Sequence, residues 1–379
     1  MIHMSVKKIG FILVLFASIA ACTKNTGTVP EPKNNPIDRQ TMLINYADNV
    51  VIPSYTTFKS KLDLMITKGD VFNTNPTKAT LAEFREAWVA AYIGWQKIEL
   101  FEFGAADKYV LRSHFNVYPA SETFINSNIA TANANFELPS TYTSQGFPAL
   151  DYLINGLGAN DDAILAFYIT ASDAAKRLAY VKKITTQMNT AFNQVFTEWK
   201  GSQRQDFISK TGMDASSSTS TLVNGFVRYY ERSLRSGKFG IPSGIMLNGT
   251  ISPEKVEAFY KKDISLTLAK TAHQAAVDFF NGKNSAGVEG PSLKTYLNAL
   301  SATDSETKGA LAKAITDQFA VADQKLNLLP TENLSTVVKT NNQLMKDVFK
   351  ELQKVVGLLK VDMTSAMSIT ITYTDNDGD

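Results

Sequence analysis

The sequence predicts an all-α fold, in which two helical-bundle domains pack against each other and a short extended tail follows. Apolar residues recur at steps of three and four along most of the chain, which is the period of a helix with one buried face. Glycine, proline and hydroxyl residues separate these stretches at the spacing of helix ends. The composition is that of an ordinary globular protein, because 44% of the 379 residues are hydrophobic and 20% are charged.

Residues 1–21 are predicted to form a lipoprotein signal peptide. Two lysines precede the apolar run 11–17, and small residues lead into Cys22, which is the only cysteine of the chain. This order resembles the lipobox of bacterial lipoproteins, so we expect Cys22 to carry a lipid that anchors the protein to a membrane leaflet. The alternative is an ordinary secretory signal that contains a cysteine. The polar segment 22–37 is expected to be a flexible tether.

The charge balance argues against nucleic acid as a partner. The formal net charge is +2, and removal of residues 1–21 takes away two lysines and no acid, which leaves 36 basic and 36 acidic residues. A chain balanced in this way has no general electrostatic attraction to nucleic acid or to anionic lipid.

An N-terminal helical bundle is predicted over residues 38–215. Its first helix is expected to be capped by Asp38 and to kink at Pro53. The same helix is expected to end near Lys68, with Gly69 just beyond its end.

The second helix of this bundle is predicted from a capping box at residues 80–83 (Thr-Leu-Ala-Glu). Its apolar face runs from Leu81 to Ile98 at helical spacing. The segment 105–145 is expected to be less regular, with short helices and loops. Two later helices of the bundle are predicted at about 148–155 and 172–200.

The hydroxyl-rich stretch 211–220 sets the predicted domain boundary between residues 215 and 216, and a C-terminal bundle is expected over 216–367. Ser252 and Pro253 are expected to cap and open a helix that ends near residue 281. A glycine-rich loop is expected at 237–244. Other helices of this bundle are predicted at about 221–235 and from about 291, 304 and 331 onward. The tail 368–379 first alternates in the manner of a strand and then becomes acidic.

Only two histidines, His114 and His273, lie downstream of the signal peptide. A zinc peptidase normally supplies two histidines and a carboxylate to its metal, often with the histidines one helical turn apart, and the sequence has no such pair. We therefore expect no hydrolytic zinc centre. His114 is expected to lie at the surface or to be capped, with a ligand role as the alternative, and His273 is expected to be structural. A serine triad is not predicted either, because the sequence has no nucleophile elbow.

Carboxylates remain as candidate ligands for a hard cation. Glu99 and Glu102 close one predicted helix and Asp151 begins another. We expect them to line a functional cleft, with Asp151 and Glu99 as the metal ligands; solvated helix-end acids are the alternative. Arg204, in the polar segment that begins at Ser202, is expected either to pair with an acid across the bundle or to lie free at the surface.

Three separated segments resemble imelysin-like proteins. They are residues 95–104 (Trp-Gln-Lys-Ile-Glu-Leu-Phe-Glu-Phe-Gly), residues 145–153 (Gln-Gly-Phe-Pro-Ala-Leu-Asp-Tyr-Leu) and the stretch 223–244, which ends in Gly-Ile-Pro-Ser-Gly. The resemblance extends over most of the mature chain. It is greatest to lipoprotein members of the family of the kind found in Bacteroidetes.

This resemblance implies two helical domains with a site at their interface, an extracytoplasmic location and, for several members, a link to iron uptake. The family is named for an insulin-cleaving peptidase, and its signature is Gly-x-His-x-x-Glu. Here Gly146 matches the glycine, Pro148 replaces the histidine and Asp151 replaces the glutamate. The signature is therefore degenerate, and we assign no catalytic residue.

We predict a non-enzymatic, lipid-anchored binding protein of the imelysin type that serves iron or haem acquisition, with iron or another divalent ion in a cleft between the domains. It is expected in the cell envelope, as an outer-membrane lipoprotein that faces the periplasm or the cell surface. Its expected partners are the membrane and a metal, haem or another envelope protein. The alternatives are a metallopeptidase of this family and a non-catalytic envelope scaffold. The predicted site residues are Glu99, Glu102, Gly146, Asp151, Ser202 and Arg204.

Overall fold

Helices account for nearly all of the regular structure in the computed structural model, which describes residues 38–374. The all-α prediction is confirmed, because extended pairing in this range is limited to two isolated β-bridges. The predicted signal peptide 1–21, the lipidation site Cys22 and the tether 22–37 lie outside the described residues. Over the described range, no helix has both the length and the apolar character that a membrane crossing requires.

The chain begins with a long helical rod made of α1 (Arg39–Asn45), the π-helical turn η1 (Tyr46–Val51) and α2 (Ile52–Thr74). Asp38 caps it as predicted, since its carboxylate accepts a hydrogen bond from the backbone of Gln40 at 3.1 Å. Pro53 is the second residue of α2, just after the π-helical turn, where the missing N–H of proline disturbs the regular hydrogen-bond pattern.

The predicted end of this helix at Lys68 is wrong. Gly69 lies inside α2, and its role is close packing, because a Cβ atom there would lie 3.1 Å from the ring of Phe84. The next helix, α3 (Lys78–Gln96), is also shifted from the prediction. Its capping box is formed by Thr77 and Thr80, one turn earlier than expected.

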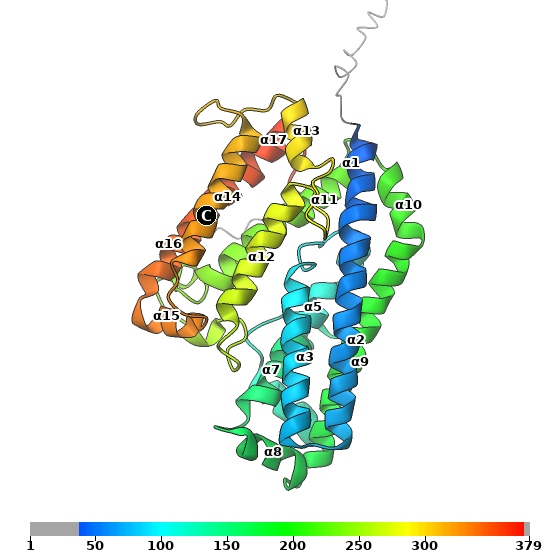
Figure 1. The fold of residues 1–379 in the computed structure, drawn as a ribbon, viewed down its shortest axis with the longest axis vertical. Coiled ribbons are helices and arrows are strands. Elements are labelled where there is room, and N and C mark those ends of the chain that lie inside the picture. Colours follow the sequence, from blue (N-terminus) through cyan, green and yellow to red (C-terminus); the bar gives the residue numbers. More distant parts are fainter. Residues whose placement is uncertain (1–37, 375–379) are drawn as a thin grey trace, which may run out of the picture. The chain divides into compact units, whose positions relative to one another are not determined.

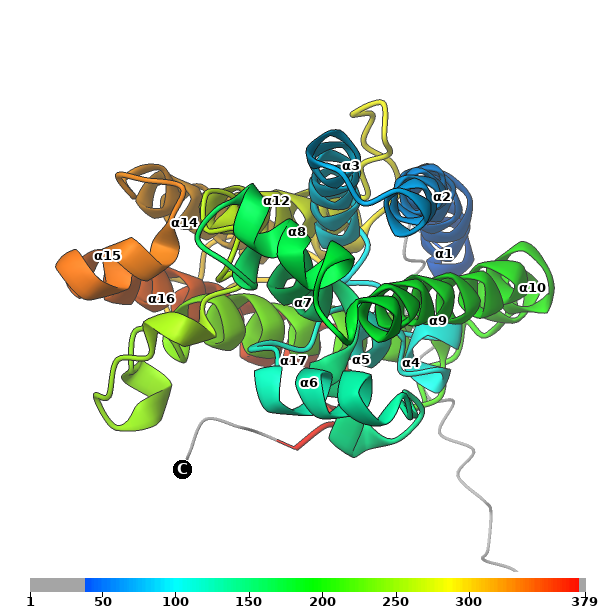
Figure 2. The ribbon, with the colours of Figure 1, turned by 90° about the horizontal axis from the view of Figure 1, so that it is seen from below.

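The apolar face predicted for α3 is confirmed, since its large side chains are buried. α2 packs against both α3 and the long helix α9 (Ala174–Lys200), and the three lie side by side in Figure 1. Seen from below, α5 and α7 lie against α9 (Figure 2). The shorter helices of this half are α4 (Ala105–Lys108), α5 (Leu111–Phe115), α6 (Glu122–Thr131), α7 (Gly146–Asp151), α8 (Asp161–Ile169) and α10 (Ser202–Ser209), with a 3-10 turn η2 (Pro139–Ser144) and a π-helical turn η3 (Tyr152–Gly156).

The second half begins with α11 (Ser218–Arg228), which continues directly into the π-helix η4 (Tyr229–Gly240). The predicted glycine-rich loop at 237–244 is therefore wrong in its first half. Short 3-10 turns follow at η5 (Ile245–Leu247) and η6 (Pro253–Lys255).

The helix predicted from Pro253 to residue 281 is also wrong. Its second part is α12 (Ser265–Phe280), while residues 256–264 form an irregular loop. The physical reason is backbone conformation, because Ala258 and Lys262 have positive φ values of 54° and 67°, which a right-handed helix does not contain.

The remaining helices pack around α14 and α16, which contact each other. Helix α16 also contacts the π-helix η4. Helices begin close to the predicted starts near residues 291 and 331. Near residue 304 a turn delays the helix to Leu311. The tail forms no strand within residues 368–374, and Asn224 binds its backbone at Thr370 and Thr372. These helices are α13 (Leu293–Ala299), α14 (Leu311–Asn327), α15 (Leu334–Thr340), α16 (Asn342–Gly357), the π-helical turn η7 (Leu358–Met363) and α17 (Thr364–Ala366).

One aromatic core spans both halves of the described chain. The ring of Phe279 on α12 lies within 6.3 Å, between ring centroids, of rings from the first half at Tyr46, Phe101 and Phe103, and 5.0 Å from Phe226 of the second half. The predicted boundary between residues 215 and 216 falls in the loop between α10 and α11 and stays a prediction.

The contact between α11 and the segment that follows α3 has almost no free space at Gly225. A Cβ atom there would lie 2.5 Å from the carbonyl oxygen of Glu102. We expect Gly225→Ala to lower the free energy of unfolding by roughly 1–3 kcal/mol through overpacking. Gly357→Ala is the matched helical control, because no atom lies within 4 Å of its Cβ position; it should be neutral or stabilising by up to about 1 kcal/mol. If Gly225→Ala and Gly357→Ala changed the free energy of unfolding equally in thermal and urea unfolding, overpacking at Gly225 would be contradicted.

Candidate functional site

Two buried carboxylates, Glu99 and Glu257, are joined by one amide side chain. The Nδ2 of Asn116 donates to Glu99 at 2.9 Å and to Glu257 at 2.7 Å, and its Oδ1 accepts from the hydroxyl of Tyr92 at 2.6 Å. Glu99 and Glu257 are each only 2% exposed. Glu99 lies in the turn after α3, Asn116 just after α5, and Glu257 in the loop before α12, so this contact bridges the two halves of the chain.

Glu257 is compensated by further partners from both halves. Lys238, on the π-helix η4, forms an ion pair with it and donates to the Oε1 of Gln96 at 2.8 Å. Gln96 in turn donates to Glu257 at 3.0 Å. Burial of an unpaired carboxylate would cost several kcal/mol of folding free energy. The donors around Glu257 replace the water that its carboxylate loses on burial. We call Gln96, Glu99, Asn116, Lys238 and Glu257 the interface cluster.

Two tyrosines beside the interface cluster stay neutral. Burial first, and then the nearby carboxylates, raise the pKa of Tyr118 and Tyr229 well above the ordinary value. The hydroxyl of Tyr229 is buried and makes no hydrogen bond to any described residue. It is therefore a spare donor next to the carboxylates.

The interface cluster continues outward through alternating charges. Arg112 donates to Glu99 at 3.1 Å and lies 3.7 Å from Glu102, and Arg228 contacts both Glu102 at 3.2 Å and Asp107 at 2.6 Å. Burial raises the pKa of Glu102, although Arg112 and Arg228 oppose the rise. The negative charge of Glu99 also raises the pKa of Glu102, because like charges in one site disfavour the charged form.

These charged residues and Arg232 line a pocket of ≈ 260 Å³, which we call the acidic pocket after its three carboxylates, Glu99, Glu102 and Asp107. Its inner wall contains Glu99, whose second carboxylate oxygen, Oε2, is buried and lacks a hydrogen-bond partner within residues 38–374. Buried polar atoms are normally satisfied, so a free carboxylate oxygen at a pocket wall indicates a place for a cation or a hydrogen-bond donor.

Asp151 does not reach this pocket but holds the loop that carries Glu257. Its carboxylate accepts hydrogen bonds from the backbone N–H groups of Tyr260 and Lys261, both at 2.9 Å, and one from the side-chain amide of Asn155 at 3.0 Å. Burial raises its pKa to about 7, against the opposing effect of these donors. Asp151 therefore positions the loop 256–264 from the first half of the chain.

Gly146 lies at the start of α7 and permits a close backbone contact. Its φ is +72°, and a Cβ atom would lie 2.3 Å from the carbonyl oxygen of Phe115. Phe115 directly precedes Asn116, so this glycine supports the interface cluster from behind. Pro148 and Asp151 both line a small cavity of ≈ 20 Å³ beside the loop 256–264, which has no room for a ligand larger than one water molecule.

Ser202 and Arg204 lie elsewhere. Arg204 forms a bidentate pair with Asp48 of η1 at 2.6 and 2.7 Å, so its predicted pairing with an acid across the bundle is confirmed. Ser202 is exposed at the start of α10. Neither residue lines the acidic pocket.

His114 and His273 both form hydrogen bonds with residues of other elements. His273 is buried, with Tyr230 and the carbonyl of Phe319 as partners, and burial lowers its pKa to about 4, which agrees with the structural role predicted for it. His114 is buried rather than at the surface, and it contacts Gln145 at 3.2 Å. Across residues 38–374, no group of three or more His, Cys, Asp or Glu side chains is arranged to hold a metal ion.

Sequence reasoning missed Asn116, Lys238 and Glu257. Glu257 falls inside the helix predicted from Pro253, and Lys238 falls inside the predicted loop 237–244, so no local signal links either residue to Glu99. The run Trp-Gln-Lys-Ile-Glu at 95–99 contains Gln96 as well as Glu99, and the spacing of three puts both near one side of a helix end. That spacing is the one signal that could have found Gln96.

The protein is an all-helical chain whose two halves meet at a buried polar cluster. Comparison with known proteins identifies its family. A profile of the imelysin family matches residues 51–360, so the chain belongs to that family. It is 23% identical over 295 residues to iron-regulated protein A of Synechococcus elongatus, covering 75% of this chain and 74% of the relative.

Two crystal structures share the fold. One is an iron-regulated protein A precursor from Parabacteroides distasonis, with a TM-score of 0.65 and 17% identity. The other is an imelysin-like protein from Psychrobacter arcticum, with a TM-score of 0.65 and 18% identity. Each match covers 88% of this chain and 97% of the other chain.

The raised pKa of Asp151 makes stability depend on pH. The folded-state pKa of about 7 lies above the ordinary value of 3.8, so the contribution of this group is complete below pH 3.8 and is lost as the pH rises through 7. We expect the free energy of unfolding to fall over this range by up to roughly 4 kcal/mol from this group. Asp151→Asn should flatten the fall in urea titrations between pH 4 and 8. Asp162→Asn, at an exposed aspartate of α8, is the control, and an unchanged pH slope in Asp151→Asn would contradict the assignment.

Proposed function

We propose that this protein is a lipid-anchored, extracytoplasmic binding protein with an iron-related ligand, and that the ligand binds in the acidic pocket at Glu99. The names of its relatives support the iron-related role, because two of them are called iron-regulated protein A. The observation that carries the site is the free Oε2 of Glu99 at the pocket wall.

The lining of the acidic pocket is balanced in charge. Three carboxylates (Glu99, Glu102 and Asp107) and three arginines (Arg112, Arg228 and Arg232) line it. Such a lining suits a ligand with both cationic and anionic groups, because the carboxylates can pair with its cation and the arginines with its anionic groups.

The donor set favours a cation that brings ligands of its own. Iron prefers several oxygen or nitrogen ligands, whereas the three carboxylates of the pocket lining, Glu99, Glu102 and Asp107, all contact arginines already. A volume of ≈ 260 Å³ fits a hydrated ion or a small chelate better than haem, because drug-sized ligands occupy about 300–1,000 Å³. Arg112 and Arg228 would then pair with anionic groups of such a chelate.

Calorimetric titration of the mature chain, residues 23–379, tests the site with ferrous, ferric, zinc and calcium ions and with haem. We expect binding of ferrous or ferric ion, and we expect Glu99→Gln to weaken it at least tenfold because the free carboxylate oxygen is lost. Glu86→Gln is the matched control, since Glu86 is an exposed acid on the neighbouring turns of α3.

Thermal unfolding of each variant shows that it is folded before titration. Absence of binding to all five probes, or equal binding by Glu99→Gln and the unchanged chain, would overturn the proposal and favour an envelope scaffold. Chelator-sensitive cleavage of a peptide substrate by the pure protein would instead point to a metallopeptidase.

The anchor is tested separately at Cys22. In a bacterial host, Cys22→Ser should abolish incorporation of radiolabelled palmitate, leave the signal peptide uncleaved and remove the lipid that holds the mature chain to membranes. Ser18→Ala, a change within the signal peptide, serves as the control. Lipid labelling that persists in Cys22→Ser would show that Cys22 is not the attachment site.

A further inference from the structure

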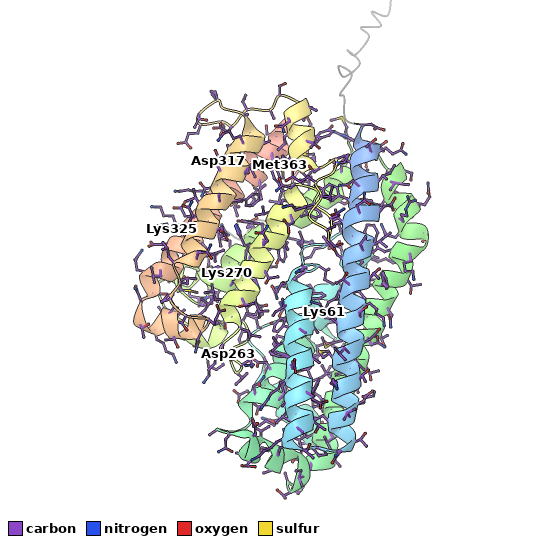
Figure 3. The ribbon with its side chains drawn as sticks, in the orientation of Figure 1. Lys61, Asp263, Lys270, Asp317, Lys325 and Met363 are labelled. Carbon is purple, nitrogen blue, oxygen red and sulfur yellow. The ribbon has the colours of Figure 1, made fainter. Side chains whose placement is uncertain are left out.

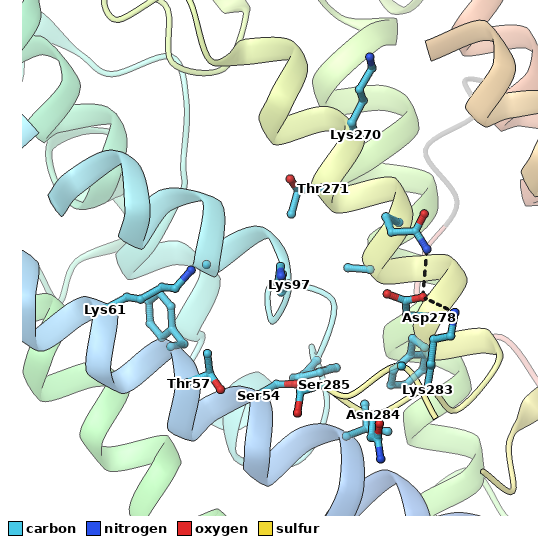
Figure 4. A pocket seen from close by; sticks show the side chains of 18 of the residues that line it. Ser54, Thr57, Lys61, Lys97, Lys270, Thr271, Asp278, Lys283, Asn284 and Ser285 are labelled. Atoms are coloured by element: carbon cyan, nitrogen blue, oxygen red, sulfur yellow. Dashed lines mark hydrogen bonds and ion pairs between the residues drawn. The ribbon is translucent and has the colours of Figure 1, made fainter. Parts of the chain in front are cut away.

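A second and larger pocket of ≈ 650 Å³ lies on the other side of the segment that follows α3. Its walls come from α2 and α3 in the first half of the chain, and from α12 and the loop 281–290 in the second. Figure 3 labels Lys61 beside α2 and Lys270 on α12, and Figure 4 shows the pocket from close by. No predicted site residue lines it.

This second pocket is basic. Four lysines line it, at positions 61, 97, 270 and 283, together with two aspartates, Asp278 and Asp323, which leaves a net charge of +2. Asp278 is already bonded to Lys283 and to Gln274, as the dashed lines of Figure 4 show. Asp323 accepts a hydrogen bond from Asn327. Lys61, Lys97 and Lys270 have no hydrogen-bond or ion-pair partner within residues 38–374.

Lys61 and Lys97 repel each other at the pocket wall. Figure 4 shows the ammonium group of Lys61 extended toward Lys97, whereas Lys270 lies at the opposite rim and points away. Burial, and then the charge of Lys97, lower the pKa of Lys61 below its ordinary value. Both ammonium groups would gain from an anion placed between them.

The backbone of α3 makes room for this arrangement. Gly94 lies on the turn of α3 that faces α2, and a Cβ atom there would lie 2.9 Å from Cδ of Lys61. The stem of Lys61 therefore packs over Gly94, which directs its charged end into the pocket rather than into open solvent. Two hydroxyl groups at the pocket, those of Ser54 and Ser285, also make no hydrogen bond within the described range.

We propose that this basic pocket binds a compact, multiply charged oxyanion through Lys61 and Lys97, with Ser54 and Ser285 as hydrogen-bond donors. Lysine ammonium groups are point charges with donors in several directions, which suits a phosphate or a carboxylate cluster. The volume admits a small organic polyanion as well as an inorganic one. This site is separate from the acidic pocket, because the two share only Phe101 among their lining residues.

Equilibrium titration of the mature chain with pyrophosphate and with citrate tests the proposal at low ionic strength. We expect at least one of the two anions to bind and to raise the melting temperature. Tighter binding of pyrophosphate would assign the site to phosphates, and tighter binding of citrate would assign it to polycarboxylates. Addition of 0.15 M sodium chloride should weaken binding, because exposed charges are screened over about 8 Å at that salt concentration.

Lys61→Gln and Lys97→Gln should each weaken anion binding at least fivefold, and the double variant should abolish the anion-induced shift in melting temperature. Lys350→Gln, at an exposed lysine of α16, is the control and should bind as the unchanged chain does. Glu99→Gln should also leave anion binding unchanged, so failure of this site and failure of the acidic pocket are distinguishable. No binding of either anion, or equal binding by the double variant and the unchanged chain, would overturn the proposal.

Discussion

The buried carboxylate of Glu257 is the constraint on which the arrangement of the two halves depends. It receives Lys238 from its own half, and Gln96 and Asn116 from the other. Such a buried ion pair adds little net stability over an apolar core, yet removal of one partner is costly, since it leaves a charge without compensation. Its physical effect is therefore to specify one docking geometry, because a shift of either half would break several hydrogen bonds at once.

The degenerate signature acquires a structural meaning from this constraint. Gly146 allows the backbone before Asn116 to approach α7, and Asp151 binds the backbone of the loop that carries Glu257. Both residues thus support the interface cluster without touching the acidic pocket. Pro148, which stands in place of the signature histidine, is buried beside the same loop and offers no metal ligand.

The segment after α3 contributes to both the basic pocket and the acidic pocket. Gly94 and Lys97 face the basic pocket, and Glu99 and Glu102 face the acidic one. Lys97 and Glu99 are two positions apart and point to different sides of a helical turn, so a short run of sequence supplies both environments. Phe101 is buried and contributes to the lining of both pockets.

By itself, the sequence determined the helical class, the cap at Asp38, the apolar face of α3 and the candidacy of Glu99, because each depends on local periodicity or on a motif within a few residues. The ends of α2 and the loop 256–264 were predicted wrongly, since packing of Gly69 on Phe84 and positive φ values at Ala258 and Lys262 override local signals. Only the tertiary structure decided that Glu99 shares Asn116 with Glu257, that Arg204 pairs with Asp48, and that Lys61 meets Lys97. The physical reason is that hydrogen bonds and Coulomb interactions act between side chains a few ångströms apart, and residues separated by 17 to 158 positions reach that distance only after the helices have packed.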